Sequence, residues 1–435
     1  MFRLGPGLAA GWALLGVLCV LSPSRANASP PDLFGYGGRS PALAMTGASY
    51  VEGYEAVFMN PAGLGPVRRR SLTVGFQAGN YNLRIDGERS PLTPPRGMVI
   101  GFALPLPFGD VLEDRLTFGG AFFTPAEVLL RGKVQFPAVP QWAVLDRAQA
   151  IGLMVGMGFD FHDILDGLHL GVGVIALADV FAELDVRLDE TNAFSSVVDL
   201  QLVTTFAPTL GVRFTQDEWG IGLTYRHESL SRMNLAIHTA DLPIEVPVLN
   251  VGGIVQYDPS TILAEGYWRP TPDVMLILNL TTRLWNFYPG TQIPTTTMGR
   301  NAPDPDFAVM PSPRVAVEGG WRDDNFEFVL RGGYAFEPTP APAARMAPRR
   351  TAAGEAITDE IVPFRLLDSH RHVLTGGFGW TILSGDSDAR VVLDVYAQLH
   401  VLQSRTHEIG ITDGAPPMVT DGTILVGGWT ARLEF

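Results

Sequence analysis

Apolar and polar side chains alternate along the last segment of the chain, and this pattern constrains the fold more than any other feature. One face of the segment carries apolar or small residues: Leu425, Gly427, Trp429, Ala431, Leu433 and Phe435. The opposite face carries Thr430, Arg432 and Glu434. Successive side chains of a β-strand point to opposite faces, so the alternation predicts a strand with one apolar and one polar side.

The same alternation recurs in residues 219–228, 326–336 and 391–401. After Leu21, no stretch approaches the roughly 18 to 20 apolar residues that a membrane-spanning helix needs. Yet 46% of the residues are hydrophobic and only 17% are charged, against about 25% charged in ordinary soluble domains. Besides a helix, only a closed β-barrel satisfies every backbone polar group inside lipid. The chain is therefore predicted to cross a membrane with strands.

A water-soluble sandwich would show the same alternation, because its strands also have one apolar face. Tryptophans near the ends of the predicted strands favour the membrane barrel, in which aromatic residues mark both interfaces. These residues are Trp219, Trp268, Trp285, Trp321, Trp380 and Trp429. We therefore expect residues 71–435 to form a transmembrane β-barrel.

Residues 1–28 have the three parts of a secretory signal peptide. Arg3 supplies the positive charge, Leu8 to Leu21 form the apolar run, and Ala26-Asn27-Ala28 form the small-residue cleavage site. The only cysteine, Cys19, follows a leucine rather than a small residue, so lipid attachment is not expected there. The mature chain is expected to begin at residue 29 without thiols or disulfides.

Fifteen segments of the chain are candidate strands, whereas bacterial single-chain barrels have even strand numbers. Pro259 lacks a backbone donor and marks a bend or bulge, so residues 248–269 are predicted to form one bent strand. This merger predicts fourteen strands and an alternation of short turns and long loops. The long loops are expected at residues 80–96, 125–146, 189–205, 229–247, 286–312, 337–370 and 403–421.

Residues 29–70 precede the first predicted strand and are too Gly-rich and too long to form one. Three parts of this segment resemble a known family: Gly35 to Ser40, Gly47-Ala48, and Glu55 to Leu64 with its Asn60-Pro61-Ala62 tripeptide. They resemble the N-terminal hatch of the outer-membrane long-chain fatty-acid and hydrocarbon transporters of the FadL/TodX type. The resemblance implies an all-β fold, a 14-stranded antiparallel barrel whose lumen is plugged by residues 29–70.

The resemblance also implies a function in the cell outer membrane. Outer loops would capture hydrophobic molecules, fatty acids or hydrocarbons, which would enter by passive diffusion without catalysis or a cofactor. In that family the exit is lateral, through a kink in the third strand. Gly119 and Gly120 occupy the matching position here, although they could instead make room for the hatch.

Several predicted lumen positions are apolar and suit a hydrophobic ligand: Leu177, Phe181, Met275, Ile277, Trp285 and Val329. Packing against the hatch is the alternative. Inward arginines could bind a carboxylate headgroup: Arg213, Arg283 and Arg331 are the main candidates, and Arg226 and Arg432 are also predicted to face inward. Because many acidic residues also face inward, salt bridges across the lumen or ties to the hatch are the alternative for each arginine.

The predicted loop at 125–146 is the candidate for first capture of the ligand. Leu129, Leu130, Phe136 and Trp142 are expected to form an exposed apolar patch there, beside Lys133, the only lysine of the chain. Packing of this loop onto its neighbours is the alternative.

Two other functions compete with transport. One is a structural or adhesive outer-membrane barrel. The other is a lipid hydrolase, for which Asp368-Ser369-His370 would be the only support, although adjacent residues seldom form a triad. His370 and His372 lack a third ligand at metal spacing, so no metal site is expected.

The expected partners follow from the predicted barrel. They are a hydrophobic small molecule, outer-membrane lipid and lipopolysaccharide, and the barrel-assembly machinery, which would bind through Phe435. The net charge of −14 makes nucleic acid an unexpected partner, because binding its phosphates requires clustered positive charge. We expect a monomer.

Overall fold

The computed structural model describes residues 30–92, 96–108, 115–126, 130–131, 139–145, 149–150, 152–188, 194–239, 249–291, 300–301, 304–323, 325–342, 345–351, 353–383, 389–408 and 416–435. The signal peptide predicted at residues 1–28 lies outside these ranges. Among the described residues, no helix is both long enough and apolar enough to span a membrane.

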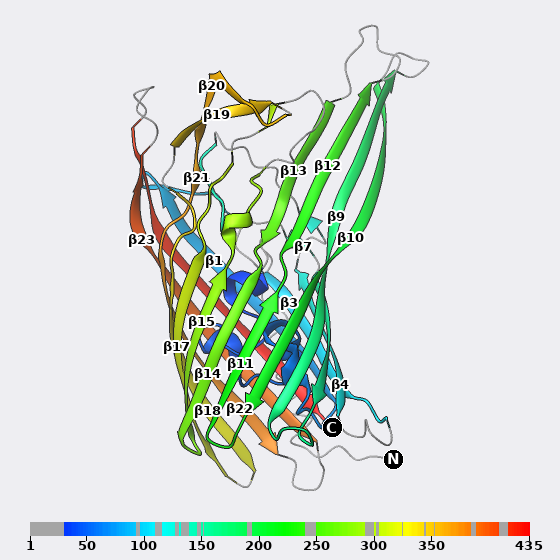
Figure 1. Cartoon of the computed structure of the whole chain (residues 1–435), viewed down its shortest axis with the longest axis vertical. Coiled ribbons are helices and arrows are strands. Elements are labelled where there is room, and N and C mark those ends of the chain that lie inside the picture. Colours follow the sequence, from blue (N-terminus) through cyan, green and yellow to red (C-terminus); the bar gives the residue numbers. More distant parts are fainter. Residues whose placement is uncertain are drawn as a thin grey trace.

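The chain forms a closed β-barrel (Figure 1). The barrel closes where the first strand pairs with the last in antiparallel register, from Ser71 opposite Glu434 to Ile85 opposite Thr420. The wall elements are β1 (Ser71–Ile85), β3 (Arg96–Pro105), β4 (Leu116–Pro125), β8 (Gly152–Asp160), β9 (Leu168–Leu188), β10 (Phe194–Thr215), β11 (Trp219–Arg226), β12 (Ser229–Thr239), β13 (Leu249–Asp258), β14 (Thr261–Thr271), β15 (Val274–Arg283), β17 (Met310–Arg322), β18 (Phe326–Glu337), β22 (Arg371–Leu383), β23 (Arg390–His407) and β24 (Met418–Glu434).

Fourteen strands cross the wall, as predicted. β13 and β14 form one strand interrupted at Pro259 and Ser260, which confirms the predicted break. β11 and β12 likewise form one interrupted strand, with a gap at His227 and Glu228. Proline accounts for the first break, because it cannot donate to a ladder.

Short turns gather at one end of the barrel and long connections at the other (Figure 1). The expected long loops were wrong in part, because neighbouring strands extend into them: β1 reaches Ile85 inside the range 80–96, and β23 and β24 extend into the range 403–421. Residues 194–205 belong to β10, residues 229–239 form β12, and β19 (Arg345–Thr351) pairs with β20 (Ala356–Phe364) inside the range 337–370. These strands continue above the apolar belt because pairing between strands does not stop at the membrane border.

The long-loop end carries several further short elements. They are β2 (Glu88–Arg89), β5 (Leu130–Arg131), β6 (Gln141–Trp142), β7 (Gln149–Ala150), β16 (Arg300–Asn301), β21 (Leu366–Leu367) and the 3-10 helix η4 (Trp285–Phe287). β6 pairs in parallel with β21, which holds the segment after β4 against the segment before β22.

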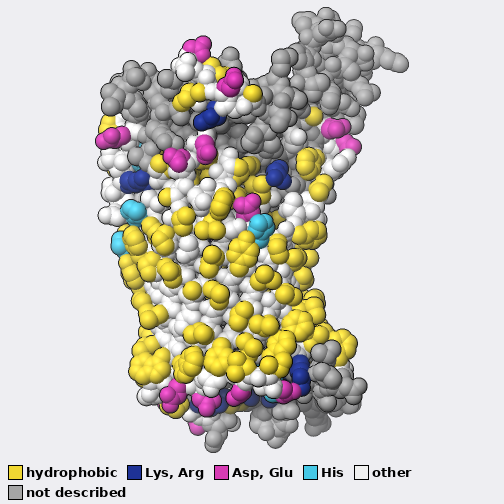
Figure 2. Space-filling view, in the orientation of Figure 1, with side chains coloured by type: hydrophobic (Ala, Val, Ile, Leu, Met, Phe, Trp, Pro, Cys, Tyr) yellow, Lys and Arg dark blue, Asp and Glu magenta, His cyan; other side chains and the backbone are white. Residues whose placement is uncertain are grey.

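Figure 2 shows a broad band of hydrophobic side chains across the face of the wall in view, with charged side chains below it. Trp219, Trp268, Trp321 and Trp380 are exposed and lie at the short-turn ends of their strands. They form the aromatic border predicted for a membrane interface. The inclusion of Trp285 in this border was wrong, because its side chain is only 1% exposed and packs among aromatic rings at the other end.

Residues 30–70 lie inside the barrel, where short helices fill the lumen (Figure 1). The elements of this plug segment are α2 (Pro30–Phe34), α3 (Arg39–Ala42), η1 (Gly53–Glu55), α4 (Ala56–Met59) and η2 (Pro61–Leu64). The largest hydrophobic core joins plug residues such as Tyr54 and Leu64 to wall residues such as Phe123 and Ile277. The core of this protein therefore lies between plug and wall.

Candidate functional site: the plug and the lumen around it

Asn60 connects the plug to itself and to the wall. Its Oδ1 accepts a hydrogen bond from the Ala62 backbone amide at 3.1 Å, which caps η2, and Pro61 occupies the first position of this helix. Its Nδ2 donates to the Ala48 carbonyl at 2.6 Å and to the Val212 carbonyl of β10 at 3.1 Å. The Asn-Pro-Ala tripeptide thus combines a helix start with a link to the barrel.

Glycines on the lumen face of the wall allow the plug to approach closely. A Cβ atom at Gly211 would lie 1.9 Å from Asn60 Oδ1, and one at Gly171 would lie 2.1 Å from the Ala62 nitrogen. A Cβ at Gly222 would lie 2.1 Å from the Ala48 carbonyl oxygen. These contacts give a structural reason for the high glycine content of the wall.

A wall carboxylate holds the plug loop that follows α3. Glu265 of β14 accepts hydrogen bonds from the Gly47 amide, the Ser49 amide and the Ser49 hydroxyl, all at 2.7 to 2.8 Å. Asn279 of β15 donates to the same carboxylate at 2.8 Å. The plug also organises itself, because Glu55 accepts from the amides of residues 38, 39 and 40.

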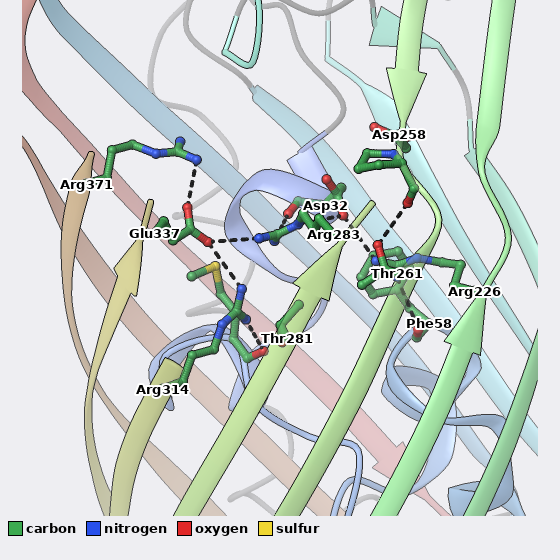
Figure 3. A network of polar contacts seen from close by, with 12 residues as sticks. Asp32, Phe58, Arg226, Asp258, Thr261, Thr281, Arg283, Arg314, Glu337 and Arg371 are labelled. Atoms are coloured by element: carbon green, nitrogen blue, oxygen red, sulfur yellow. Dashed lines mark hydrogen bonds and ion pairs between the residues drawn. The ribbon is translucent and has the colours of Figure 1, made fainter. Parts of the chain in front are cut away.

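A buried network of charges surrounds the start of the plug (Figure 3). Asp32 Oδ1 of α2 forms an ion pair with Arg226 Nη2 at 3.1 Å and lies 3.6 Å from Arg283 Nε. Arg283 Nη1 lies 3.2 Å from Glu337 Oε1, and Arg314 Nη2 lies 3.2 Å from the same oxygen. Glu337 Oε2 accepts from Arg371 Nη2 at 2.7 Å.

The three arginines predicted as headgroup ligands all have protein partners. Arg213 donates to the Val51 carbonyl at 3.2 Å and to Glu52 at 3.1 Å. Arg331 pairs with Glu318 at 2.8 Å and with Asp394. Arg283 in turn lies beside Asp32 and Glu337. The three arginines therefore form hydrogen bonds and ion pairs with the plug and across the lumen, as the alternative interpretation of the sequence expected.

The predicted apolar lining residues occupy different surroundings. Met275 and Ile277 pack into the core between plug and wall. Leu177 borders a small cavity, and Phe181 lies farther up β9 and is half-buried. Val329 borders a cavity lined by charged residues at the short-turn end of the barrel.

Trp285 is also buried, in an aromatic cluster with Tyr257, Tyr288 and Phe307 whose ring centroids lie 5.0 to 5.8 Å apart. This cluster lies at the long-loop end of the lumen, where η4 leaves β15. Trp285 is thus part of the packing beneath the loops.

Two cavities lie beside the plug towards the short-turn end, with volumes of about 470 and 670 Å³. Both are bordered by Arg39 and Glu52 and by further charged residues of the wall. A third cavity of about 40 Å³ lies on the other side of the plug. One part of its lining is apolar, with Phe58, Phe123, Met154, Ile175 and Leu177, and another part is polar, with Asp32, Arg226, His227, Gln256 and Asp258. The lumen is therefore charged below the plug and partly apolar above it.

The kink predicted in the third strand is not found. β4 keeps one continuous register with β3 and with β8 through Gly119 and Gly120, without a bulge. A Cβ at Gly119 would lie 2.7 Å from Leu64 of the plug, and one at Gly120 would lie 2.4 Å from the Phe102 ring. Gly119 thus makes room for the plug, which was the alternative interpretation.

Part of the predicted capture loop lies outside the described residues, including Leu129 and Phe136. Leu130 belongs to β5, which pairs with β7. The exposure expected for Trp142 was wrong: its side chain is 0% exposed and packs in a core with Leu145 and Leu402. Burial of these large side chains by the neighbouring strands provides more free energy than leaving them in water.

Ser369 and His370 have different partners. The Ser369 hydroxyl is buried and lies 2.8 Å from the Thr420 hydroxyl. His370 Nδ1 accepts a hydrogen bond from the Thr339 amide at 3.0 Å. Burial, with the nearby Arg405 charge, lowers the pKa of His370 below its ordinary value. These contacts do not align the two side chains as a nucleophile and its base.

Fold and plug together define a class, the plugged 14-stranded transmembrane barrel. No protein-family model and no curated protein sequence matches the chain. Solved structures do match, and the chain has the FadL/TodX-type fold. A Pseudomonas aeruginosa FadL homologue has a TM-score of 0.55 and 14% identity, covering 92% of this chain and 97% of that one.

Two further structures extend this likeness. The P. putida toluene transporter TodX has a TM-score of 0.54 and 12% identity, covering 93% of this chain and 99% of that chain. The CymD monoaromatic hydrocarbon channel has a TM-score of 0.51 and 11% identity, covering 92% and 97%. At these identities the likeness concerns the fold.

Proposed function

We propose that this protein is an outer-membrane transporter for the passive uptake of hydrophobic compounds, either long-chain fatty acids or hydrocarbons. The observation that carries the proposal is the buried plug, which fills the barrel in place of an open aqueous channel and leaves a partly apolar cavity above it. A sparingly soluble molecule gains free energy by leaving water for such a lining. The toluene transporter TodX and the CymD monoaromatic hydrocarbon channel share the fold, which supports the proposal.

Within this proposal the plug is residues 29–70 and the barrel is residues 71–435. The signal peptide is removed after Ala28, and the mature protein resides in the outer membrane in contact with lipid and lipopolysaccharide. Phe435 supports recognition by the barrel-assembly machinery, because it is 57% exposed while its backbone pairs with Arg70. We propose a monomeric protein that performs no catalysis.

The ligand is proposed to contact Leu177, which borders the cavity, and Phe181 farther along β9, with Met275 and Ile277 in the core against the plug. Leu129, Leu130 and Phe136 remain the proposed site of first capture. Arg213, Arg283 and Arg331 are assigned to holding the plug, because each already has a buried partner. A headgroup would have to compete with those partners, and breaking a buried ion pair is costly.

A structure of the purified protein soaked with bromobenzene tests ligand binding, because anomalous scattering locates the bromine. The proposal predicts a bromine peak in the lumen within contact distance of Leu177 or Phe181. Bromine found only on the outer, lipid-facing surface would contradict it. Deletion of residues 29–66 tests the plug: we expect a folded barrel that now admits small sugars. An unfolded product would show that this segment is structural core.

A structural or adhesive barrel is the second candidate. The strands that rise above the apolar belt favour it, because they would present surface outside the membrane (Figure 1). Unchanged uptake of fatty acids and hydrocarbons in a deletion strain, together with lost cell adhesion, would support this candidate instead.

A further inference from the structure

A short segment from the connection after β4 folds inward and lies over the plug. Its residues Trp142 and Leu145 are both 0% exposed. They pack in one core with Leu33 and Phe34 of α2, the first helix of the plug. The connection that follows β4 therefore covers the plug from the long-loop side of the barrel. We call residues 141–145 the roof segment.

The roof segment reaches two sides of the barrel wall. The core that contains Trp142 and Leu145 includes buried residues of β1, β23 and β24. The residues between them, Ala143 and Val144, belong to a different core, which includes buried residues of β13 and β17. On the shorter way around the wall, β23, β22, β18, β17 and β15 separate β24 from the strand of β13 and β14. A solute that enters from the long-loop end therefore meets the roof segment before the plug.

The ladder that holds the roof segment is short. β6 pairs with β21 over two residues, and the amides of Gln141 and Ala143 donate to the carbonyls of Arg365 and Leu367, both at 3.2 Å. In the wall, β4 and β8 pair over eight residues each. A segment with a short ladder opens at a lower free-energy cost than the wall around it. Side-chain packing therefore provides much of the attachment, and a solute that takes the same space can displace it.

The site that Trp142 occupies suits a ring without polar groups. Its indole Nε1 is buried and has no hydrogen-bond partner among the described residues, whereas in water the same N–H would donate to a water molecule. A buried donor without an acceptor loses the free energy of that hydrogen bond. The surrounding core consists of aliphatic and aromatic side chains. An aromatic hydrocarbon with two rings can fill this space without an unpaired donor.

We propose that the roof segment is displaceable and that Trp142 holds the place of an aromatic hydrocarbon of one or two rings. An entering solute takes the site of Trp142, and the roof segment leaves the core and opens the way to the plug. The inference rests on the proposed function, because it names the class of solute and the step at which this solute enters the lumen. It gives the buried Trp142 a role within the connection that was predicted to capture the ligand.

The first test detects displacement without transport. Cys19, the only cysteine, lies in the predicted signal peptide, so Leu145→Cys adds a single thiol to the mature chain. In lipid vesicles saturated with naphthalene, we expect a water-soluble maleimide to label position 145 at least tenfold faster than without naphthalene. Val373→Cys is the matched control, because Val373 is also 0% exposed but packs with Ala44 and Met45 in another core. Its labelling should not change, and an unchanged rate at position 145 would overturn the inference.

The second test locks the roof segment in place. Gln141 and Leu366 lie opposite each other in the ladder of β6 and β21, and neighbouring strands are close enough for a disulfide. In cells with the double variant Gln141→Cys and Leu366→Cys, we expect naphthalene uptake to be at least fivefold lower with the disulfide oxidised than after its reduction. The double variant Leu374→Cys and Leu399→Cys is the control, because this pair joins β22 to β23 at exposed positions of the wall. Its oxidation should leave uptake unchanged.

The outcomes of the two tests separate this inference from the proposed function. Equal uptake by the oxidised and the reduced form of the variant at Gln141 and Leu366, above that of cells without the protein, would overturn the inference, because a fixed roof segment would then not hinder passage. If wild type takes up no naphthalene while naphthalene still accelerates labelling at position 145, the proposed function fails and the displaceable roof segment stands.

Discussion

Gly211 of the wall lies directly against Asn60 of the plug, so closely that a Cβ atom at Gly211 would be 1.9 Å from Asn60 Oδ1. The same oxygen caps η2, and the Asn60 amide group bonds to the Val212 carbonyl. The absence of a side chain at Gly211 therefore allows Asn60, which caps η2, to pack directly against β10. We call this contact the Gly211–Asn60 joint. This joint relates the Asn-Pro-Ala tripeptide to the wall against which it packs.

Substitution of Gly211 should loosen the plug. Gly211→Ala forces Asn60 to move, and overpacking of this kind typically costs about 1–3 kcal/mol. We expect a lower thermal unfolding midpoint and faster proteolysis of the plug segment in detergent. Gly266→Ala is the control, because the nearest atom to its Cβ would be 3.6 Å away. An unchanged midpoint in Gly211→Ala would show that the joint is not tight.

Removal of the Glu337 charge should destabilise the barrel strongly. Glu337 is 1% exposed and pairs with Arg283, Arg314 and Arg371. Glu337→Gln leaves these buried cations without their shared anion, and breaking a buried pair typically costs about 3–5 kcal/mol. Denaturant unfolding followed by tryptophan fluorescence measures this loss.

The control for Glu337 is Glu327, which pairs with Arg322 at the surface at 3.1 Å. Glu327→Gln should cost less than about 1 kcal/mol, because exposed ion pairs contribute little. Equal effects of the two substitutions would mean that the network in Figure 3 does not fasten the wall to the plug.

Protonation of His370 should weaken the attachment of the segment at Thr339, which follows β18. The pKa of His370 is lowered by burial and by Arg405, and its Nδ1 accepts the Thr339 amide only in the neutral state. A lowered folded-state pKa means that this contribution is complete above the ordinary value of 6.5 and declines as the pH falls through the folded-state value. The protection of the Thr339 amide against hydrogen exchange, measured relative to its intrinsic exchange rate at each pH, should therefore fall on acidification.

His370→Asn separates this effect from general acid instability. The asparagine carbonyl oxygen can accept a hydrogen bond from the Thr339 amide at any pH, so the protection of this amide relative to its intrinsic exchange rate should no longer fall below pH 6.5. Asp368, nearby and buried, has a raised pKa and therefore changes stability in the opposite direction on acidification. Identical pH dependence in wild type and His370→Asn would exclude His370 as the cause.

The sequence predicted the wall because each strand carries its own signal. Alternation at residues 425–435 identified β24, and Pro259 identified the break between β13 and β14. A comparable signal in residues 229–239 was missed: Met233, Leu235 and Ile237 alternate with polar or small residues. Residues 229–247 were instead predicted to be a long loop, because short turns and long loops were expected to alternate along the chain.

The site was less predictable because its contacts join residues far apart in the chain. Periodicity placed Arg213 and Arg331 inward, but nothing local identifies Glu52 or Asp394 as their partners. No pattern in the sequence singled out Asp32, whose carboxylate receives Arg226. The parallel pairing of β9 with β12 is also a property of the closed wall, since each strand alone would fit an antiparallel neighbour.

The most direct test of the proposed function is uptake by cells that have a lipopolysaccharide outer leaflet and lack their own transporters for hydrocarbons and fatty acids. The initial uptake rates of radiolabelled toluene, oleate and a small sugar are compared with and without this protein, with its folded state confirmed by heat-dependent gel mobility. We expect faster uptake of toluene or oleate and no change for the sugar. Equal rates for both apolar compounds with and without the folded barrel would contradict it.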